Sequence, residues 1–165
     1  MLSGTLMSQI IASITVATIF TSTFGFVSGT VSEGGGIYLG AGSLAVQSST
    51  ISGNVALTNA GLSDALGGAI YQAGGSLAVT NSTFAYDAAD DQSSSSGLAA
   101  GGALYVAAGT ATFQNCAFDY DSALGVQGFG GAIYVGPDGS ITLSRTMSFL
   151  GDTASTAGNS IYFGS

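Results

Sequence analysis

Carboxylates are the side chains with which this chain could most readily do chemistry, because it has nine Asp and Glu residues, one Lys or Arg and no His. Two pairs are close in sequence: Asp90 with Asp91, and Asp119 with Asp121. An inverting glycosidase needs only two carboxyl groups about 6.5–9.5 Å apart. A polysaccharide lyase also needs a base beside its acidic sugar, and a single Arg supplies little for that step. Since Asp90 and Asp91 begin the Ser-rich segment 90–96, we expect a solvated loop there and no catalytic residues.

A second acidic set consists of Asp87, Asp121 and Asp152, which recur at equivalent positions of a repeat, with Asn54 as the fourth member. Like charges stacked one repeat apart repel one another. A bound Ca²⁺ would relieve that repulsion, because hard cations prefer carboxylate oxygens. Alternatively, the side chains cap turns through hydrogen bonds to the backbone. The repeat lacks the GGxGxD pattern of calcium-binding repeats, so we favour capping, keep the three Asp residues as a weak calcium candidate, and expect no cofactor.

The composition excludes several classes of function. Charged residues are 6% of the chain, against about a quarter in a typical soluble protein. With Arg145 as its only base, the chain cannot neutralise a phosphate backbone, so nucleic acid is not expected as a partner. The absence of His removes His-ligated zinc and His-based triads. Cys116, which the repeat aligns with Thr50 and Thr83, cannot form an internal disulfide, and we expect a buried thiol.

The elements that carry these residues are internal repeats. A Gly-Gly-Ala-Ile-Tyr phrase occurs with variations five times, and its aliphatic member falls at positions 37, 70, 104, 133 and 161. A second phrase of the type Gly-Ser-Leu-Ala-Val begins at 42, 75, 109 and 139, and a third, Phe-x-x-Asp or Ile-x-x-Asn, begins at 51, 84, 118 and 149. The only proline, Pro137, lies in the longest of the intervals between the first and third phrases.

Each repeat contains three short segments with a period of two and no segment long enough for a helix. Such strands bury a face only when successive repeats stack and pair them about 4.8 Å apart. The sequence therefore predicts an all-β chain, a single parallel β-helix (solenoid) of about five to six coils with three short strands per coil. We expect loops on one side of the coil, at 55–66, 88–100, 122–129 and 153–157.

Alternation along the strands assigns side chains to the inside or the outside. One inward ladder is expected from the first phrase, namely Ile37, Ile70, Leu104, Ile133 and Ile161. A second is expected from Leu44, Leu77, Ala111 and Ile141, and Gln72 is the one polar residue among the inward positions. The Gly pair before each first strand is expected at a corner that needs a positive φ or a close approach to the next coil.

The same alternation sends a column of tyrosines outward: Tyr38, Tyr71, Tyr105, Tyr134 and Tyr162. An exposed column of aromatic rings forms a stripe of the kind that marks an interface. Stacking between the rings is the alternative, since cross-strand pairs contribute roughly 0.2–1 kcal/mol each. Binding of a sugar ring is the third possibility. We favour an interface.

Residues 1–33 form an apolar segment ahead of the repeats at 34–165, and both belong to one predicted domain, 1–165. Residues 1–32 contain no charged side chain, which raises the possibility of a signal sequence or a membrane helix. The segment is rich in β-branched residues and lacks a basic start, and residues 4–9 resemble 42–47. We therefore expect a first coil or capping segment.

The repeats resemble the GGA(I/L/V) and FxxN repeats of polymorphic outer-membrane proteins and related autotransporter-type adhesins, which are pectin-lyase-like. The likeness covers about residues 34–163 and differs in placing Asp at three of the four FxxN ends. It implies a right-handed β-helix, an extracellular or cell-surface location and a structural or adhesive function without catalysis. A carbohydrate-active or carbohydrate-binding β-helix is the alternative, with a host or matrix glycan as a possible ligand.

The two ends of the sequence predict an assembly. Residues 4–9 resemble a second-type strand, and residues 161–165 complete a first-type strand, so both ends lie at the same corner of a coil. No charged cap is present at either end, and uncapped solenoid ends have unpaired strand edges. We expect head-to-tail stacking of copies into a filament, unless the chain is part of a longer surface β-helix.

Overall fold

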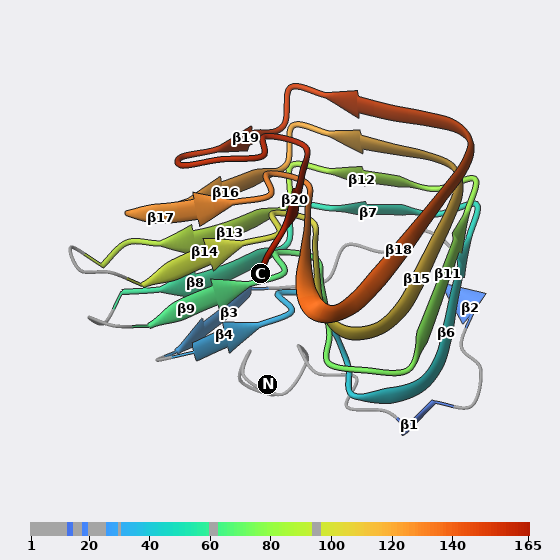
Figure 1. Cartoon of the computed structure of the whole chain (residues 1–165), viewed down its shortest axis with the longest axis horizontal. Coiled ribbons are helices and arrows are strands. Elements are labelled where there is room, and N and C mark those ends of the chain that lie inside the picture. Colours follow the sequence, from blue (N-terminus) through green and yellow to red (C-terminus); the bar gives the residue numbers. More distant parts are fainter. Residues whose placement is uncertain (1–12, 15–17, 20–25, 30, 60–62, 94–96) are drawn as a thin grey trace, which may run out of the picture.

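The computed structural model describes residues 13–14, 18–19, 26–29, 31–59, 63–93 and 97–165. Throughout these residues the regular structure is β-strand, and every strand pairing is parallel. Successive repeats stack as the coils of a β-solenoid (Figure 1). The predicted parallel β-helix is therefore confirmed, although it has about four turns rather than five to six.

Three columns of strands form the coil. Column one contains β5 (Ile37–Leu39), β10 (Ile70–Gln72), the starts of β15 (Leu104–Asp119) and β18 (Ile133–Leu150), and β20 (Ile161–Phe163). Column two contains β6 (Ala41–Gln47), β11 (Ser76–Thr80) and the middles of β15 and β18. Column three contains β7 (Thr50–Ser52), β12 (Thr83–Ala85) and the ends of β15 and β18. The two long strands thus bend around both corners of the coil.

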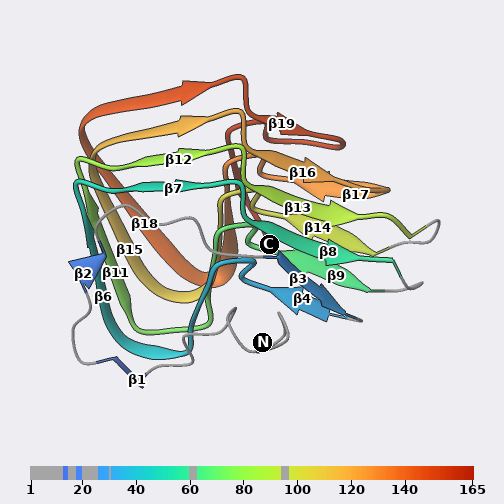
Figure 2. The same cartoon turned by 180° about the vertical axis from the view of Figure 1, so that it is seen from behind.

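The regions predicted as loops on one side contain two further columns of strands, so that prediction is wrong. One column consists of β3 (Phe26–Gly29), β8 (Val55–Thr58), β13 (Ala88–Asp91), β16 (Ser122–Leu124) and β19 (Thr153–Ala154). The other consists of β4 (Val31–Glu33), β9 (Asp64–Leu66), β14 (Leu98–Ala100) and β17 (Gln127–Phe129). Together they form an arm that projects from the coil (Figure 2), so a full coil has five strands rather than three.

Small side chains explain why the arm folds as strands although its sequence does not predict them. Its buried residues include Ala56, Ala65, Ala89, Ala99 and Ala123, each fully shielded from solvent. Alanine has a low intrinsic preference for strands, and strand preferences depend strongly on what packs against the residue. The two sheets of the arm lie close together because nothing larger than a methyl group stands at these positions.

Described parts of the N-terminal segment are also strands. β1 (Ser13–Ile14) and β2 (Thr18–Ile19) pair in parallel with β6. The predicted match of residues 4–9 to residues 42–47 lies outside the described residues. The described N-terminal partners of β6 are β1 and β2, which come after residue 9. Among the described residues, no helix is long and apolar enough to cross a membrane.

The interior of the coil is apolar. In the ladder of column one, Ile37, Ile70, Leu104 and Ile133 are buried, whereas Ile161 in the last coil is partly buried. The column-two ladder has the same form, with Leu44, Leu77 and Ala111 buried and Ile141 partly buried. Gln72 is fully buried among these residues, and its Nε2 donates to the carbonyl oxygens of Gly75 and Thr110, both at 3.2 Å.

The Gly pair at the corner before column one has both features expected from the sequence, a positive φ and a close approach to the next coil. Gly67 has φ +66°, which an L side chain adopts only with strain. A Cβ on Gly68 would collide with the carbonyl oxygen of Gly102 and lie 2.5 Å from the backbone nitrogen of Ala88. The second glycine therefore allows the arm to pack directly against the corner of the coil.

Candidate functional site

An acidic column lies where each coil leaves column three and enters the arm. We define it as Asn54, Asp87, Asp121 and Asp152, all of them buried. Each Asp accepts a hydrogen bond from the backbone N–H of the preceding member. The N–O distances are 2.8 Å for Asn54 to Asp87, 2.9 Å for Asp87 to Asp121 and 3.0 Å for Asp121 to Asp152. Nδ2 of Asn54 donates a second bond to the same oxygen of Asp87, also at 2.8 Å.

Burial controls the charge of this column. Removal from water, together with the neighbouring Asp87 carboxylate, raises the pKa of Asp121 to about 9. Burial also raises the pKa of Asp87 to about 7 and that of Asp152 to about 6, although backbone hydrogen bonds oppose the change. The Oδ2 atoms of all three Asp residues have no hydrogen-bond partner within the described structure. At neutral pH the column therefore carries at least the proton on Asp121.

The geometry of the acidic column favours a structural role over calcium binding, although not the turn capping expected from the sequence. Oδ1 of each Asp accepts a backbone N–H of the preceding coil, so these hydrogen bonds join adjacent coils rather than cap a turn within one coil. Calcium needs six to eight oxygen ligands. In the part of the chain that the structure describes, no three His, Cys, Asp or Glu side chains are grouped to hold a metal ion. The calcium interpretation of Asp87, Asp121 and Asp152 therefore gains no support from their arrangement.

The first carboxylate pair does not lie in a loop, which corrects the prediction for Asp90 and Asp91. Both residues belong to β13, whose backbone is paired on both sides, with β8 and with β16. Asp91 is buried inside the arm, where its Oδ1 accepts bonds from Oγ1 of Thr58 at 3.1 Å and from the backbone N–H of Ser93 at 2.9 Å. Successive strand residues point to opposite faces, so the two carboxyl groups do not converge.

The second pair is divided in the same way. Asp119 ends β15 on its outer, partly exposed face, whereas Asp121 is buried in the acidic column. A glycosidase needs both carboxyl groups at one sugar, on either side of the bond that breaks. Neither pair presents two carboxyl groups to a common cleft.

The tyrosine column lies on the outer side of column one. Its five residues, Tyr38, Tyr71, Tyr105, Tyr134 and Tyr162, are in register and half-buried. Adjacent rings stack with centroids 5.3, 5.2, 4.7 and 5.6 Å apart. Burial, followed by the charges of neighbouring Tyr134 and Asp64, raises the pKa of Tyr105 to about 12. Burial and Glu33 likewise raise the pKa of Tyr71. The rings cover one another, and their role as an interface stays a prediction.

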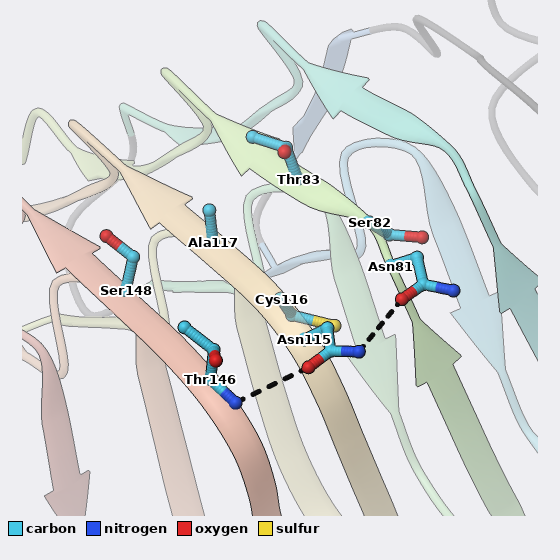
Figure 3. Close-up of a pocket in the computed structure, with 8 residues that line it drawn as sticks. All are labelled: Asn81, Ser82, Thr83, Asn115, Cys116, Ala117, Thr146 and Ser148. Atoms are coloured by element: carbon cyan, nitrogen blue, oxygen red, sulfur yellow. Dashed lines mark hydrogen bonds between the residues drawn. The ribbon is translucent and has the colours of Figure 1, made fainter.

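A shallow groove of about 450 Å³ crosses the outer face of column three (Figure 3), and no phrase of the sequence indicated it. It is lined by amides, hydroxyls and small side chains: Asn81, Ser82, Thr83, Asn115, Cys116, Ala117, Thr146 and Ser148. Nδ2 of Asn115 donates to Oδ1 of Asn81 at 3.1 Å, and Oδ1 of Asn115 accepts from the N–H of Thr146 at 3.4 Å. The side chains that line the groove are thus uncharged, and amides and hydroxyls supply its polar groups.

Cys116 lies beneath this groove with its side chain buried. Its Sγ lies 3.5 Å from the carbonyl oxygen of Val79 and 3.4 Å from that of Gln114. The predicted alignment with Thr83 is wrong by one residue, because the strand register pairs Thr83 with Ala117. Cys116 therefore faces inward, and although the residue lines the groove it is only 3% exposed.

Two tyrosines that the repeat pattern does not single out lie in the turns after the strands that line this groove. Tyr86 and Tyr120 lie in the middle of the third phrase, where the adjacent aromatic and acidic residues dominate the pattern. The repeats themselves mark this position, because the residue equivalent to Tyr86 and Tyr120 is glycine in the other two third phrases, Gly53 and Gly151. A Tyr at a position where the repeat otherwise has glycine indicates an unusual backbone conformation or a specific role.

The fold and these sites define a parallel β-solenoid with stacked polar and aromatic rows. A scan against protein-family models finds no match to the chain, and searches of curated proteins and of solved structures find none either.

Proposed function

We propose that this chain is a non-catalytic structural or adhesive β-helix of the extracellular space or cell surface, which assembles head to tail with further copies of itself or forms part of a larger surface β-helix. The observation that carries this proposal is an open strand edge. In the described residues, β18 pairs with β15 along most of its length, but its other edge pairs only at 133–135, with β20. Unpaired N–H and C=O groups along such an edge are a template for another strand.

The core beneath that edge is also incompletely covered. Ile141, Met147 and Phe149 occupy the inward positions of β18 and are only partly buried. Leu143 pairs with the fully buried Phe113 but is itself 37% exposed, and Phe163 is 65% exposed. In every earlier coil these positions are covered by the next coil, so an equivalent coil would bury the same apolar surface.

A second copy fits this surface, as would a further coil if the chain is part of a longer β-helix. A second copy supplies strands of the same spacing and inward side chains of the same kind, because its coils repeat those already stacked here. Residues 1–32 contain no charged side chain that would oppose such a contact. A contact between two different ends of the molecule is heterologous and continues as a filament when it does not close into a ring.

The test is the oligomeric state of the purified chain and of two matched variants. We expect concentration-dependent oligomers in sedimentation velocity and filaments in negative-stain micrographs. Leu143→Lys places a charge on the open core and should prevent assembly, whereas Thr142→Lys on the outer face of the same strand should leave it unchanged. If the first variant fails to fold by circular dichroism, Phe163→Lys tests the same surface at a more exposed site. A parent chain that stays monomeric at high concentration overturns the assembly.

A further inference from the structure

The turn after column three is occupied by residues in the left-handed region of φ. Gly53, Tyr86, Tyr120 and Gly151 take this position in successive coils, with φ of 68°, 57°, 60° and 70°. Glycine adopts this conformation freely, whereas a bulky residue does so only with strain. The backbone thus favours glycine at all four places, yet two of them carry a large ring. Such strain persists only where the surroundings enforce it.

Burial does not compensate for the strain. Tyr86 is 65% exposed and Tyr120 is 49% exposed. Their rings stack on each other with centroids 5.3 Å apart and planes 7° from parallel. On the far side of Tyr120, a Cβ at Gly151 would lie 2.5 Å from its ring, so that face is covered. On the far side of Tyr86, the space above Gly53 is empty to 4 Å. The pair therefore forms a shelf with an open end toward Gly53.

The tyrosine shelf follows, along the chain, the strands of column three that line the groove. Thr83 lines the groove and lies three residues before Tyr86 on the same strand and turn. Asn81 stands at the opposite corner of this face, and its amide nitrogen points away from Asn115 (Figure 3). One outer face therefore presents hydroxyls and amides in the groove and aromatic rings at its edge.

Hydroxyls, amides and aromatic rings on one face favour a particular kind of ligand. A sugar has an apolar C–H face that stacks on an aromatic ring and hydroxyls that bond to amides and hydroxyls. The chain carries a net charge of −8, and Asp119 stands on this face directly before Tyr120, so an acidic sugar would be repelled. A protein partner would need a larger patch than this groove, which eight small or medium-sized residues line.

We infer that the shelf of Tyr86 and Tyr120, with the groove beside it, is a binding site for a neutral oligosaccharide. This inference names a ligand for the adhesive part of the proposed function. Its site lies on a side face of the solenoid, apart from the open edge of β18, so the two proposals can fail separately.

The experiment replaces both rings with glycine in the full chain. Tyr86→Gly with Tyr120→Gly removes the shelf and installs the residue found in the two other coils, so the variant should melt no lower than the parent. Binding is measured by calorimetric titration with four neutral probes, which are oligosaccharides of glucose, xylose, mannose and N-acetylglucosamine. Oligogalacturonate serves as the acidic comparison.

We expect at least one neutral probe to bind the parent and the double Gly variant to bind it about tenfold or more weakly, about 1.4 kcal/mol. Tyr86→Phe with Tyr120→Phe keeps the rings and should bind within about twofold of the parent. The inference is overturned if no neutral probe binds, if oligogalacturonate binds more tightly, or if the Gly variant binds like the parent. The Gly variant should also sediment like the parent, which separates this site from the assembly surface.

Discussion

Replacing Asp121 by Asn removes the carboxyl group that has the highest pKa in the acidic column. Asn fits this position, because Asn54 occupies the equivalent place and donates from Nδ2 to Asp87 of the next coil. In the variant, Oδ1 can still accept from the backbone N–H of Asp87, and Nδ2 can donate to Asp152. The substitution therefore keeps the hydrogen bonds and abolishes the titration.

The size of the effect follows from the pKa. Folding raises the pKa of Asp121 from 3.8 to about 9, so the folded state holds a proton that the unfolded state releases. The stabilisation is complete below pH 3.8 and is lost progressively as the pH rises toward 9. At pH 7 the free energy of unfolding is lower by about 4 kcal/mol than it is in acid, because pH 7 lies about three units above the unfolded pKa of 3.8 and each unit is about 1.4 kcal/mol. Asp87 and Asp152 add losses of the same sign, because burial raises their pKa values too.

Urea unfolding followed by circular dichroism at several pH values between 3 and 9 measures how the free energy of unfolding depends on pH. We expect Asp121→Asn to raise the free energy of unfolding at pH 7 by up to about 4 kcal/mol, to change it little at pH 3, and to flatten its fall with pH. Asp138→Asn, at an exposed position of β18 whose charge does not shift the acidic column, is the matched control and should behave like the parent. An Asn variant that is less stable than the parent at pH 7, or equally dependent on pH, refutes the reasoning.

Two further substitutions test the packing. Leu104→Asp places an unpaired carboxylate in a fully buried site, which costs several kcal/mol against a typical total stability of about 5–15, so the variant should be unfolded by circular dichroism; a variant that melts like the parent would contradict the position of Leu104 in the core. Gly68→Ala should lower the melting temperature more than Gly53→Ala does, because its Cβ meets backbone atoms, whereas a Cβ at Gly53 has open space and only an unfavourable φ. Equal losses in calorimetric melting would show that the arm does not press on this corner.

The coil could be predicted from the sequence because its information is local and repeated. Alternation at residues such as Ile70, Tyr71 and Gln72 places each side chain inside or outside, and the spacing of the phrases sets the stacking. The interval from Tyr134 to Phe149 is longer than the equivalent intervals of the other repeats. Its extra residues lie at two register shifts between β15 and β18, one near Pro137 and one near Arg145.

The arm and the groove could not be predicted in this way. Strands such as β14, Leu98–Ala100, form because a neighbouring sheet packs against small side chains, which is a tertiary effect that a single segment does not reveal. The same limit hid the inward orientation of Asp91, since its partner Thr58 is 33 residues away. The spacing of the repeats predicted that the residues of the acidic column stack. It could not predict their protonation, because the raised pKa values come from burial.

The parallel pairing of the coils has a mechanical consequence. Hydrogen bonds between the strands of adjacent coils run along the axis of the solenoid, and all five columns contribute to them. Tension applied evenly along that axis is shared by every bond between two coils, so it must break them together. Tension applied to a single strand meets the same bonds one after another and peels the coil away at a lower force. The molecule is thus built to resist stretching along its axis and to yield when it is pulled from one edge.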